Sequence, residues 1–176
     1  MAARSARLFF AAWPPPDVQG ALGTAAQALQ RECGGRAVPA RNIHLTRVFL
    51  GSVAREHHSR LEKLAAAARA PRFELRLDRV AWWRHNRIVW AGVPECPLAL
   101  SALVEQLERG LSSAGFHFDR RPYAAHITLV RNARRAPARA TAVSVTWPVN
   151  RFALMESAAS GQGRAYDMLL EWPLTA

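Results

Sequence analysis

The sequence predicts an α+β protein in which short strands are interspersed with three helices. Segments whose hydrophobic residues repeat every two residues, as in strands, alternate with segments that repeat about every 3.6 residues, as in helices. Their order along the chain is β α β α β β α β β β. Proline and glycine clusters at 14–16 and 34–35 separate the first of these segments. One short motif recurs on two of the predicted strands, nearly half of the chain apart. Two lobes, each a small sheet with helices outside, would bring those two strands together at a central cleft.

The first half of the chain contains two of the predicted helices. Residues 7–13 form a strand that ends at the prolines, and proline suits the first turn of a helix over 15–32. One face of that helix carries Val18, Leu22, Ala25 and Leu29. A strand at about 43–50 follows, closed by Gly51, and a second helix at about 54–69 ends before Pro71.

The second half is richer in predicted strands. Residues 73–83 alternate between hydrophobic and charged side chains, which predicts one half-buried strand, and a turn at 85–87 leads to a returning strand at 88–93. Regularly spaced leucines predict a third helix over 97–113. A strand at 125–131, a basic loop at 132–140, and strands at 143–156 and 165–172 complete the chain.

The recurring motif is a histidine and a threonine separated by one hydrophobic residue. It pairs His44 with Thr46 and His126 with Thr128. Residues i and i+2 of a strand point to the same face, so two facing strands would surround a small volume with two imidazoles and two hydroxyls. Imidazole gives and takes protons near neutral pH, and hydroxyls donate to non-bridging phosphate oxygens. The motif pair therefore predicts metal-free acid–base chemistry on a phosphate, without a cofactor.

Composition favours a polyanionic partner. The formal net charge is +11, the sequence pI is about 11.5, and almost all basic residues are arginines. A strong positive field attracts nucleic acids, although a general bias toward arginine in a chain rich in alanine, proline and glycine is the alternative explanation. At 176 residues the chain suits one domain, and we expect residues 1–176 to form a single domain of two lobes that share a core.

Several features limit where the protein works and what it binds. Cys33 and Cys96 lack the spacing of a zinc site or a disulfide framework, so we expect free thiols and no metal. The N-terminal apolar run is too short and too aromatic for a secretion signal, and no stretch is long enough to span a membrane. We therefore expect a cytoplasmic protein, without membrane association, that acts as a monomer.

With these motifs the chain resembles the 2H phosphoesterases, specifically the RNA 2′,3′-cyclic phosphodiesterases once called 2′-5′ RNA ligases. The resemblance covers almost the whole chain and rests on four segments: residues 7–11 at the start, residues 42–51 around the first motif, residues 121–131 around the second, and the closing strand at 157–172. It implies a bilobal fold of two small, mainly antiparallel sheets with helices outside and a central cleft between pseudo-symmetric lobes. Arg47 and Ala125 depart from the family pattern, which favours an apolar residue and proline there. Strand parity directs Arg47 away from the cleft.

The resemblance also implies an activity. It is hydrolysis of a 2′,3′-cyclic phosphate at an RNA end to a 2′-phosphomonoester, with reversible 2′-5′ ligation as the companion reaction. His44 is then the general acid and His126 the general base, while Thr46 and Thr128 hold the phosphate. A phosphodiesterase for 2′-5′ oligonucleotides, or an RNA-binding module without catalysis, remains an alternative.

Four arginines beyond the motifs are candidate RNA contacts. In a regular strand Arg131 would point away from His126, and only a bulge or the strand end would turn it toward the cleft. Arg134 and Arg135, with Arg139, form a basic loop that would bind RNA phosphates or simply be solvated. Of Trp82 and Trp83, one is expected in the core and the other exposed, and packing is favoured over stacking on a base.

Overall fold

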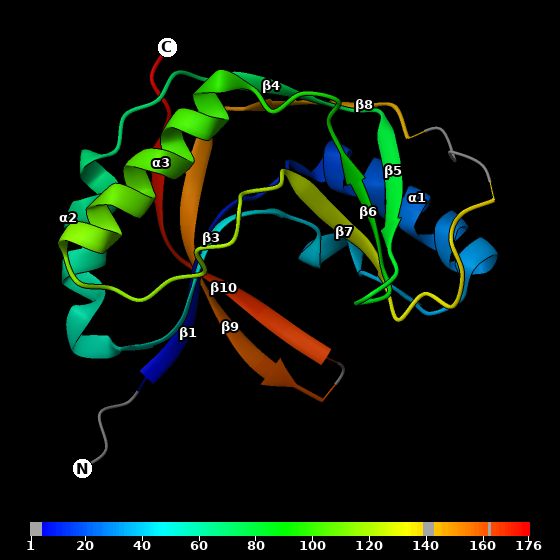
Figure 1. The fold of residues 1–176 in the computed structure, drawn as a ribbon, viewed down its shortest axis with the longest axis horizontal. Helices are drawn as coiled ribbons and strands as arrows, with labels where there is room; N and C mark the ends of the chain where they lie inside the picture. Colours follow the sequence, from blue (N-terminus) through cyan, green and yellow to red (C-terminus); the bar gives the residue numbers. More distant parts are fainter. Residues whose placement is uncertain (1–4, 139–142, 162) are drawn as a thin grey trace.

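The computed structural model describes residues 5–138, 143–161 and 163–176. Its elements, in chain order, are β1 (Ser5–Ala12), α1 (Pro16–Cys33), β2 (Arg36–Ala37), η1 (Ala40–Asn42), β3 (Leu45–Ala54), η2 (Arg55–His57), α2 (His58–Ala67), β4 (Phe73–Leu77), β5 (Arg79–Trp83), β6 (Ile88–Gly92), α3 (Leu98–Ser113), β7 (His126–Arg131), β8 (Val145–Val149), β9 (Arg151–Ser160) and β10 (Gly163–Pro173). The predicted α+β class, with small antiparallel sheets and helices outside, is confirmed (Figure 1).

The strands form two four-stranded sheets and one two-stranded sheet. Sheet A has the order β10-β9-β1-β3, and sheet B has the order β2-β7-β6-β5. The small third sheet, β4-β8, was not predicted. Neighbouring strands in all three run antiparallel. The first motif therefore belongs to sheet A, and the second belongs to sheet B.

The helices cover the outer faces of the sheets, and each helix packs against at least one element from the other half of the sequence. Helix α1 packs against β2, β7 and β8, whereas α3 packs against β3 and α2 against β10 and α3 (Figure 1). Each sheet thus combines strands or helices from both ends of the sequence. Pairing of β1 with β9 joins strands from the two ends of the chain at the centre of sheet A, as expected if terminal strands pair.

Two of the predicted strands are wrong, because each is two strands in different sheets. Residues 73–83 divide at Asp78 into β4, which pairs with β8, and β5, which pairs with β6. Residues 143–156 divide at Asn150 into β8 and β9. Two consecutive exposed residues mark each break, Asp78 and Arg79 in the first and Asn150 and Arg151 in the second. Periodicity records which side chains are buried but not which strand lies alongside.

The first motif strand is longer than predicted. Gly51 does not end it, because β3 continues to Ala54 through a bulge at which Leu8 pairs with Gly51 and Phe9 with Phe49. Gly51 has φ +72°, a conformation that favours glycine, and the bulge bends the strand without stopping its pairing.

Two hydrophobic clusters stabilise the fold. The larger one is continuous between the sheets and combines their inner faces with the apolar stripes of all three helices. The smaller one comprises Phe9, Ala11, Ala153 and Met155 and lies on the opposite face of sheet A, with Trp13, Phe49 and Tyr166 packed on it. This second cluster packs beneath the first motif, where Phe9 contacts His44.

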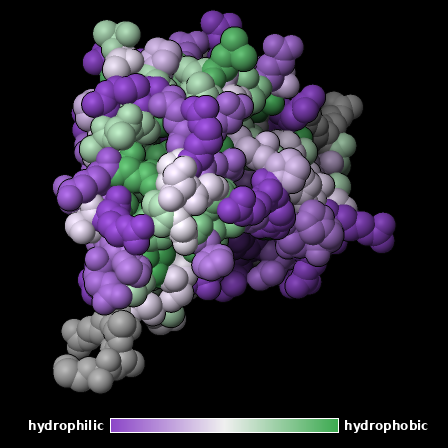
Figure 2. Space-filling view, turned by 60° about the vertical axis from the view of Figure 1, so that its left-hand side comes forward, coloured by the Kyte–Doolittle hydropathy of each residue, from purple (hydrophilic) through white to green (hydrophobic). Residues whose placement is uncertain are grey.

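One face of the molecule is mainly hydrophilic, in keeping with the arginine content (Figure 2). Figure 2 shows one face on which hydrophilic side chains predominate and hydrophobic ones are confined to small patches. None of the helices in the described ranges combines the length and apolar character that a membrane span requires.

Candidate active site

The two motif histidines occupy equivalent positions in different sheets. His44 immediately precedes β3, and His126 is the first residue of β7. The Tyr123 hydroxyl donates to the Thr46 carbonyl oxygen at 3.2 Å, which ties the segment before β7 to the first motif strand. The charge of His126 contributes to lowering the pKa of His44. The structure thus brings the two motifs to one site.

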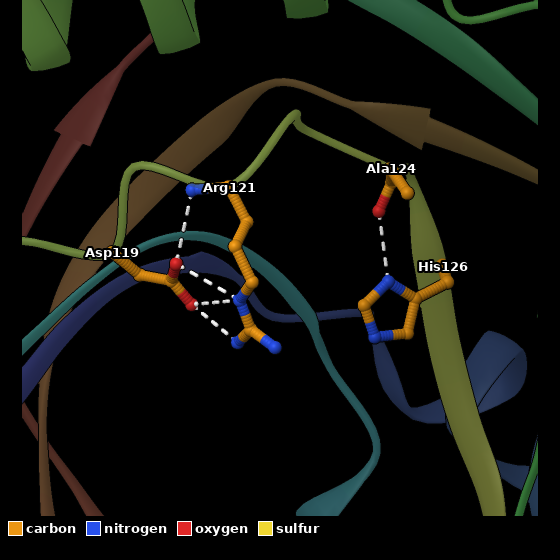
Figure 3. Close-up of polar contacts among 4 residues, drawn as sticks. All are labelled: Asp119, Arg121, Ala124 and His126. Carbon is orange, nitrogen blue, oxygen red and sulfur yellow. Dashed lines mark hydrogen bonds and ion pairs between the residues drawn. The ribbon is translucent and has the colours of Figure 1, made fainter. Parts of the chain in front are cut away.

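Each imidazole makes an equivalent contact with the backbone carbonyl two residues before it. Nδ1 of His44 lies 2.7 Å from the Asn42 carbonyl oxygen. Nδ1 of His126 lies 2.8 Å from the Ala124 carbonyl oxygen (Figure 3). A carbonyl only accepts, so each Nδ1 carries a hydrogen, and Nε2 is the nitrogen left to exchange a proton. Either histidine can therefore accept a proton when neutral or donate one when charged.

Each motif strand carries a β-bulge directly after its threonine. In β3, Thr46 pairs with Ala11 and Val48 with Phe10, which leaves Arg47 as the extra residue. In β7, Thr128 pairs with Trp90 and Val130 with Val89.

Leu129 is accordingly the extra residue of β7. A bulge reverses the alternation of the residues that follow it, so Leu129 and Val130 are both buried and Arg131 emerges on the face of His126 and Thr128. The expectation from regular strand parity is wrong for Arg131, because the bulge turns it toward the cleft. Its charge lowers the pKa of both catalytic candidates, His44 and His126.

The motif threonines offer free hydroxyls. Thr46 and Thr128 are half-buried, and within the described residues neither hydroxyl is engaged by a side chain or by the backbone. Each hydroxyl lies two residues from a histidine on the same strand face. The pair can therefore donate to oxygens of a group held between the two imidazoles.

Aromatic side chains surround His44. The Trp13 indole stacks on its imidazole with ring centres 4.8 Å apart and planes 6° apart, while Phe9 and Tyr166 lie 5.2 Å and 5.0 Å from it. Burial in this apolar setting is the largest cause that lowers the pKa of His44, to about 4, and the charges of Arg131 and His126 act in the same direction. The Asn42 carbonyl opposes the shift.

Sheet B provides a similar aromatic setting for His126. Trp83 meets its ring edge-on at 4.6 Å, and Trp90 lies 6.4 Å away. Burial again lowers the pKa, helped by Arg131 and Arg121. Trp83 lies on the cleft face, because the β5–β6–β7 register places it beside Trp90 and His126. The neighbouring Trp82 packs against the larger core, so the two tryptophans face opposite sides of the sheet, as expected for neighbours on a strand.

Gly92 makes room for this arrangement. It is the residue opposite His126 on β6, and a Cβ atom there would come within 2.5 Å of the Trp90 ring. That distance is far below van der Waals contact, so glycine permits Trp90 to cover the strand beside the histidine.

Arg47 points away from the cleft, as predicted. It is buried, with its guanidinium 5.3 Å from the centre of the Phe73 ring, and burial lowers its pKa to about 10. In the described part of the chain its guanidinium nitrogens have no hydrogen-bond partner. A cation–π contact therefore compensates only partly for the lost hydration.

An ion pair lies close to His126. Arg121 donates to both carboxylate oxygens of Asp119, and its backbone N–H donates to the same side chain at 3.1 Å (Figure 3). The hydrogen bonds from Arg121 lower the pKa of Asp119. The segment before β7 is thus fixed by a local pair as well as by Tyr123.

The loop arginines have structural contacts. The Arg135 Nε donates to the Glu32 carbonyl oxygen at 2.8 Å in the last turn of α1, and the Arg134 backbone N–H donates to the Cys33 carbonyl at 2.9 Å. Cations and donors stabilise helix C-termini. Arg139 lies outside the described residues.

The described ranges contain no group of three histidine, cysteine, aspartate or glutamate side chains that could hold a metal ion. Cys33 is buried, Cys96 is exposed, and both are free.

Comparison with known proteins agrees with this geometry. The RNA 2′,3′-cyclic phosphodiesterase of Escherichia coli strain K12 is 33% identical over 170 residues, covering 96% of this chain and 97% of that protein. The enzyme of the same name from Thermus thermophilus is 33% identical over 184 residues, covering 96% and 90%. The crystal structure of E. coli LigT complexed with 3′-AMP aligns with a TM-score of 0.86 and 32% identity, over 98% of this chain and 100% of that one. A model of the 2′-5′ RNA ligase superfamily matches residues 14–161, and the chain belongs to that family of 2H phosphoesterases.

Proposed function

We propose that the protein hydrolyses a 2′,3′-cyclic phosphate at an RNA 3′ end to a 2′-phosphomonoester. The observation that carries this proposal is the pair of imidazoles with matching Nδ1 contacts, 2.7 Å and 2.8 Å, from two sheets. That arrangement supplies one proton acceptor and one proton donor to a single group. The E. coli and T. thermophilus relatives named RNA 2′,3′-cyclic phosphodiesterase support the choice of substrate.

The chemical step needs two proton transfers. Neutral His126 accepts a proton from water at Nε2 as the water oxygen bonds to phosphorus. The P–O3′ bond breaks, and the His44 imidazolium donates its Nε2 proton to O3′. The products are a 3′-hydroxyl and a 2′-phosphomonoester, and exchange of protons with solvent restores both histidines. Thr46 and Thr128 donate to the non-bridging oxygens, where negative charge lies in the transition state. The assignment of acid and base follows the family resemblance.

The negative charge of the substrate favours the protonation state of His44 that the mechanism requires. Burial disfavours imidazolium at both positions in the free protein. A cyclic phosphate carries one negative charge, and an anion between the imidazoles favours their charged forms. Protonation of His44 is thereby coupled to substrate binding.

The same step joins a cyclic-phosphate end to a hydroxyl when the 5′-hydroxyl of a second RNA takes the place of water. Its oxygen bonds to phosphorus, its proton goes to His126, the P–O3′ bond breaks with a proton from His44, and a 2′-5′ linkage results. Run backward, with the roles of the two histidines exchanged, this step cleaves a 2′-5′ linkage and restores the cyclic phosphate. Arg131, together with Arg134 and Arg135, completes the proposed RNA contacts, of which Arg131 is the one on the cleft face.

The decisive experiment is turnover of a short RNA with a 2′,3′-cyclic end in the presence of EDTA. The wild type should form the 2′-phosphate, and His44→Ala and His126→Ala should each lower turnover by about 10² or more, the low end for one acid–base group. His85→Ala, an exposed histidine in the β5–β6 turn, is the matched control. Cleavage of a 2′-5′-linked oligonucleotide instead would favour a 2′-5′ phosphodiesterase. RNA binding without turnover would favour a non-catalytic module.

A further inference from the structure

Two arginines face each other across the outer strand pair of sheet B. Arg36 on β2 and Arg131 on β7 are direct cross-strand partners, and Ala37 and Val130 form the next pair. Both arginines are exposed, whereas Val130 is fully buried and Ala37 packs against the core. Residues opposite each other in an antiparallel pair share a face, so Arg36 and Arg131 both project on the side of the cleft.

The pair is held in place by the backbone. A Cβ atom on Gly35 would lie 2.5 Å from the Arg131 carbonyl oxygen, so glycine lets β2 approach the end of β7 closely. The Val38 N–H donates to the Leu129 carbonyl at 2.8 Å, which extends the contact beyond the two residues of β2. Neither guanidinium is therefore positioned by a flexible loop alone.

Like charges in this position repel. Directly opposed side chains of one sign destabilise a strand pair, and neither arginine forms an ion pair or a side-chain hydrogen bond in the described ranges. An anion between the two guanidinium groups would convert the repulsion into two charge-assisted contacts. The position along the strand suits an extended ligand, since β7 runs from His126 to Arg131, a rise of about 16 Å.

We propose that Arg36 and Arg131 together bind an internal phosphodiester of the RNA strand, on the 5′ side of the cyclic phosphate held by the two motifs. This inference rests on the proposed function and specifies its substrate as an oligonucleotide rather than a mononucleotide. Arg131 also lowers the pKa of both histidines, so a substitution there would change binding and chemistry together. A substitution at Arg36 therefore reports on the contact with the internal phosphodiester alone.

Two measurements test the proposal. Equilibrium binding uses a 5′-labelled RNA tetranucleotide with a 2′-phosphate, followed by anisotropy from about 50 to 200 mM salt, the range over which phosphate contacts are lost. Turnover of a nucleoside 2′,3′-cyclic phosphate reports the chemistry separately. Arg36→Gln should weaken tetranucleotide binding on the order of fivefold at low salt and reduce the slope of log K against log[salt] by about 0.7, the loss of one single-strand phosphate contact. Mononucleotide turnover should not change.

Three variants complete the design. Arg109→Gln removes one exposed charge from α3, remote from sheet B, and should bind like the wild type. Arg36→Lys should retain the salt slope. Arg36→Glu should raise the melting temperature by pairing with Arg131 while it weakens RNA binding most.

Equal binding and equal slopes for Arg36→Gln and Arg109→Gln would overturn the proposal, even if the cyclic mononucleotide is hydrolysed normally. If the wild type did not hydrolyse a short RNA with a 2′,3′-cyclic end, the proposed function would instead be contradicted, and the binding data would still decide the role of Arg36.

Discussion

The Trp13 indole and the His44 imidazole lie face to face, 4.8 Å between ring centres and 6° between planes. His126 has no such partner in the described residues, since Trp83 meets it at 65° and Trp90 at 73°. The face of an indole attracts a cation, so parallel stacking favours the imidazolium form of His44. This asymmetry distinguishes two histidines whose backbone contacts are alike, and it supports His44 as the proton donor.

Replacement of Trp13 should therefore affect the proton affinity of His44. Trp13→Leu keeps an apolar cover but loses the aromatic face, which removes about 0.5–2 kcal/mol of stabilisation from the imidazolium. We expect a lower His44 pKa and a lower kcat, whereas Trp13→Phe should retain most of both. NMR titration of the His44 ring, with phosphate bound, measures the shift directly. An unchanged His44 titration in Trp13→Leu would show that the indole only packs.

The pH dependence of kcat/KM should be centred on the acidic side of neutrality. The active free protein carries one proton on the pair, and burial lowers the pKa of both histidines, that of His44 to about 4. Because the pKa of each histidine lies below the ordinary imidazole value of about 6.5, the pair has largely lost its remaining proton above about pH 6.5, and kcat/KM should fall about tenfold per pH unit there. The pH values at which kcat rises and falls should be higher than those for kcat/KM, because bound phosphate favours the charged forms of the two histidines. A profile of kcat/KM that is flat between about pH 7 and 8.5 would contradict this.

Burial of His44 should also make the fold acid-sensitive. The unfolded chain binds a proton at this residue below about pH 6.5, whereas the folded protein does so only below about 4. Stability is thus fully retained above about pH 6.5 and decreases as pH falls toward about 4, by up to about 3 kcal/mol from this group.

Denaturant unfolding from about pH 7 to about pH 4.5 measures that loss. His44→Gln should lose less stability over this range than the wild type, while His85→Gln, at an exposed position, should follow the wild type. Parallel curves for wild type and His44→Gln would show that His44 is not buried in its neutral form.

A methyl group at Gly92 should disturb the site through Trp90. The added Cβ atom would meet the indole at 2.5 Å, and Trp90 must move toward Trp83, whose ring centre is 5.1 Å away. We expect Gly92→Ala to cost about 1–3 kcal/mol of stability, typical of overpacking, and to lower kcat more than it raises KM. Gly20→Ala, where nothing lies within 4 Å, is the matched control. Equal values of kcat and KM for Gly92→Ala and Gly20→Ala would show that the position of Trp90 does not affect catalysis.

Local sequence patterns were enough to predict the candidate catalytic residues and most of the helices and strands. A histidine and a threonine two positions apart on a strand share a face whatever the fold, so the two motifs could be recognised locally. Helices α1 and α3 were predicted within one or two residues, because their hydrophobic spacing and flanking proline and glycine are local signals.

Which strands pair, and where the β-bulges lie, depends on contacts between segments that are far apart in the sequence. The bulges at Arg47 and Leu129 exist because β3 and β7 match the register of β1 and β6, and the bulge in β7 turns Arg131 into the cleft. The division of 73–83 and of 143–156 between sheets, the stacking of Trp13 on His44, and the pairing of Arg36 with Arg131 likewise depend on partners distant in sequence. Periodicity specifies which side of a segment is buried, whereas register and neighbours are set by packing among segments, which no local pattern encodes.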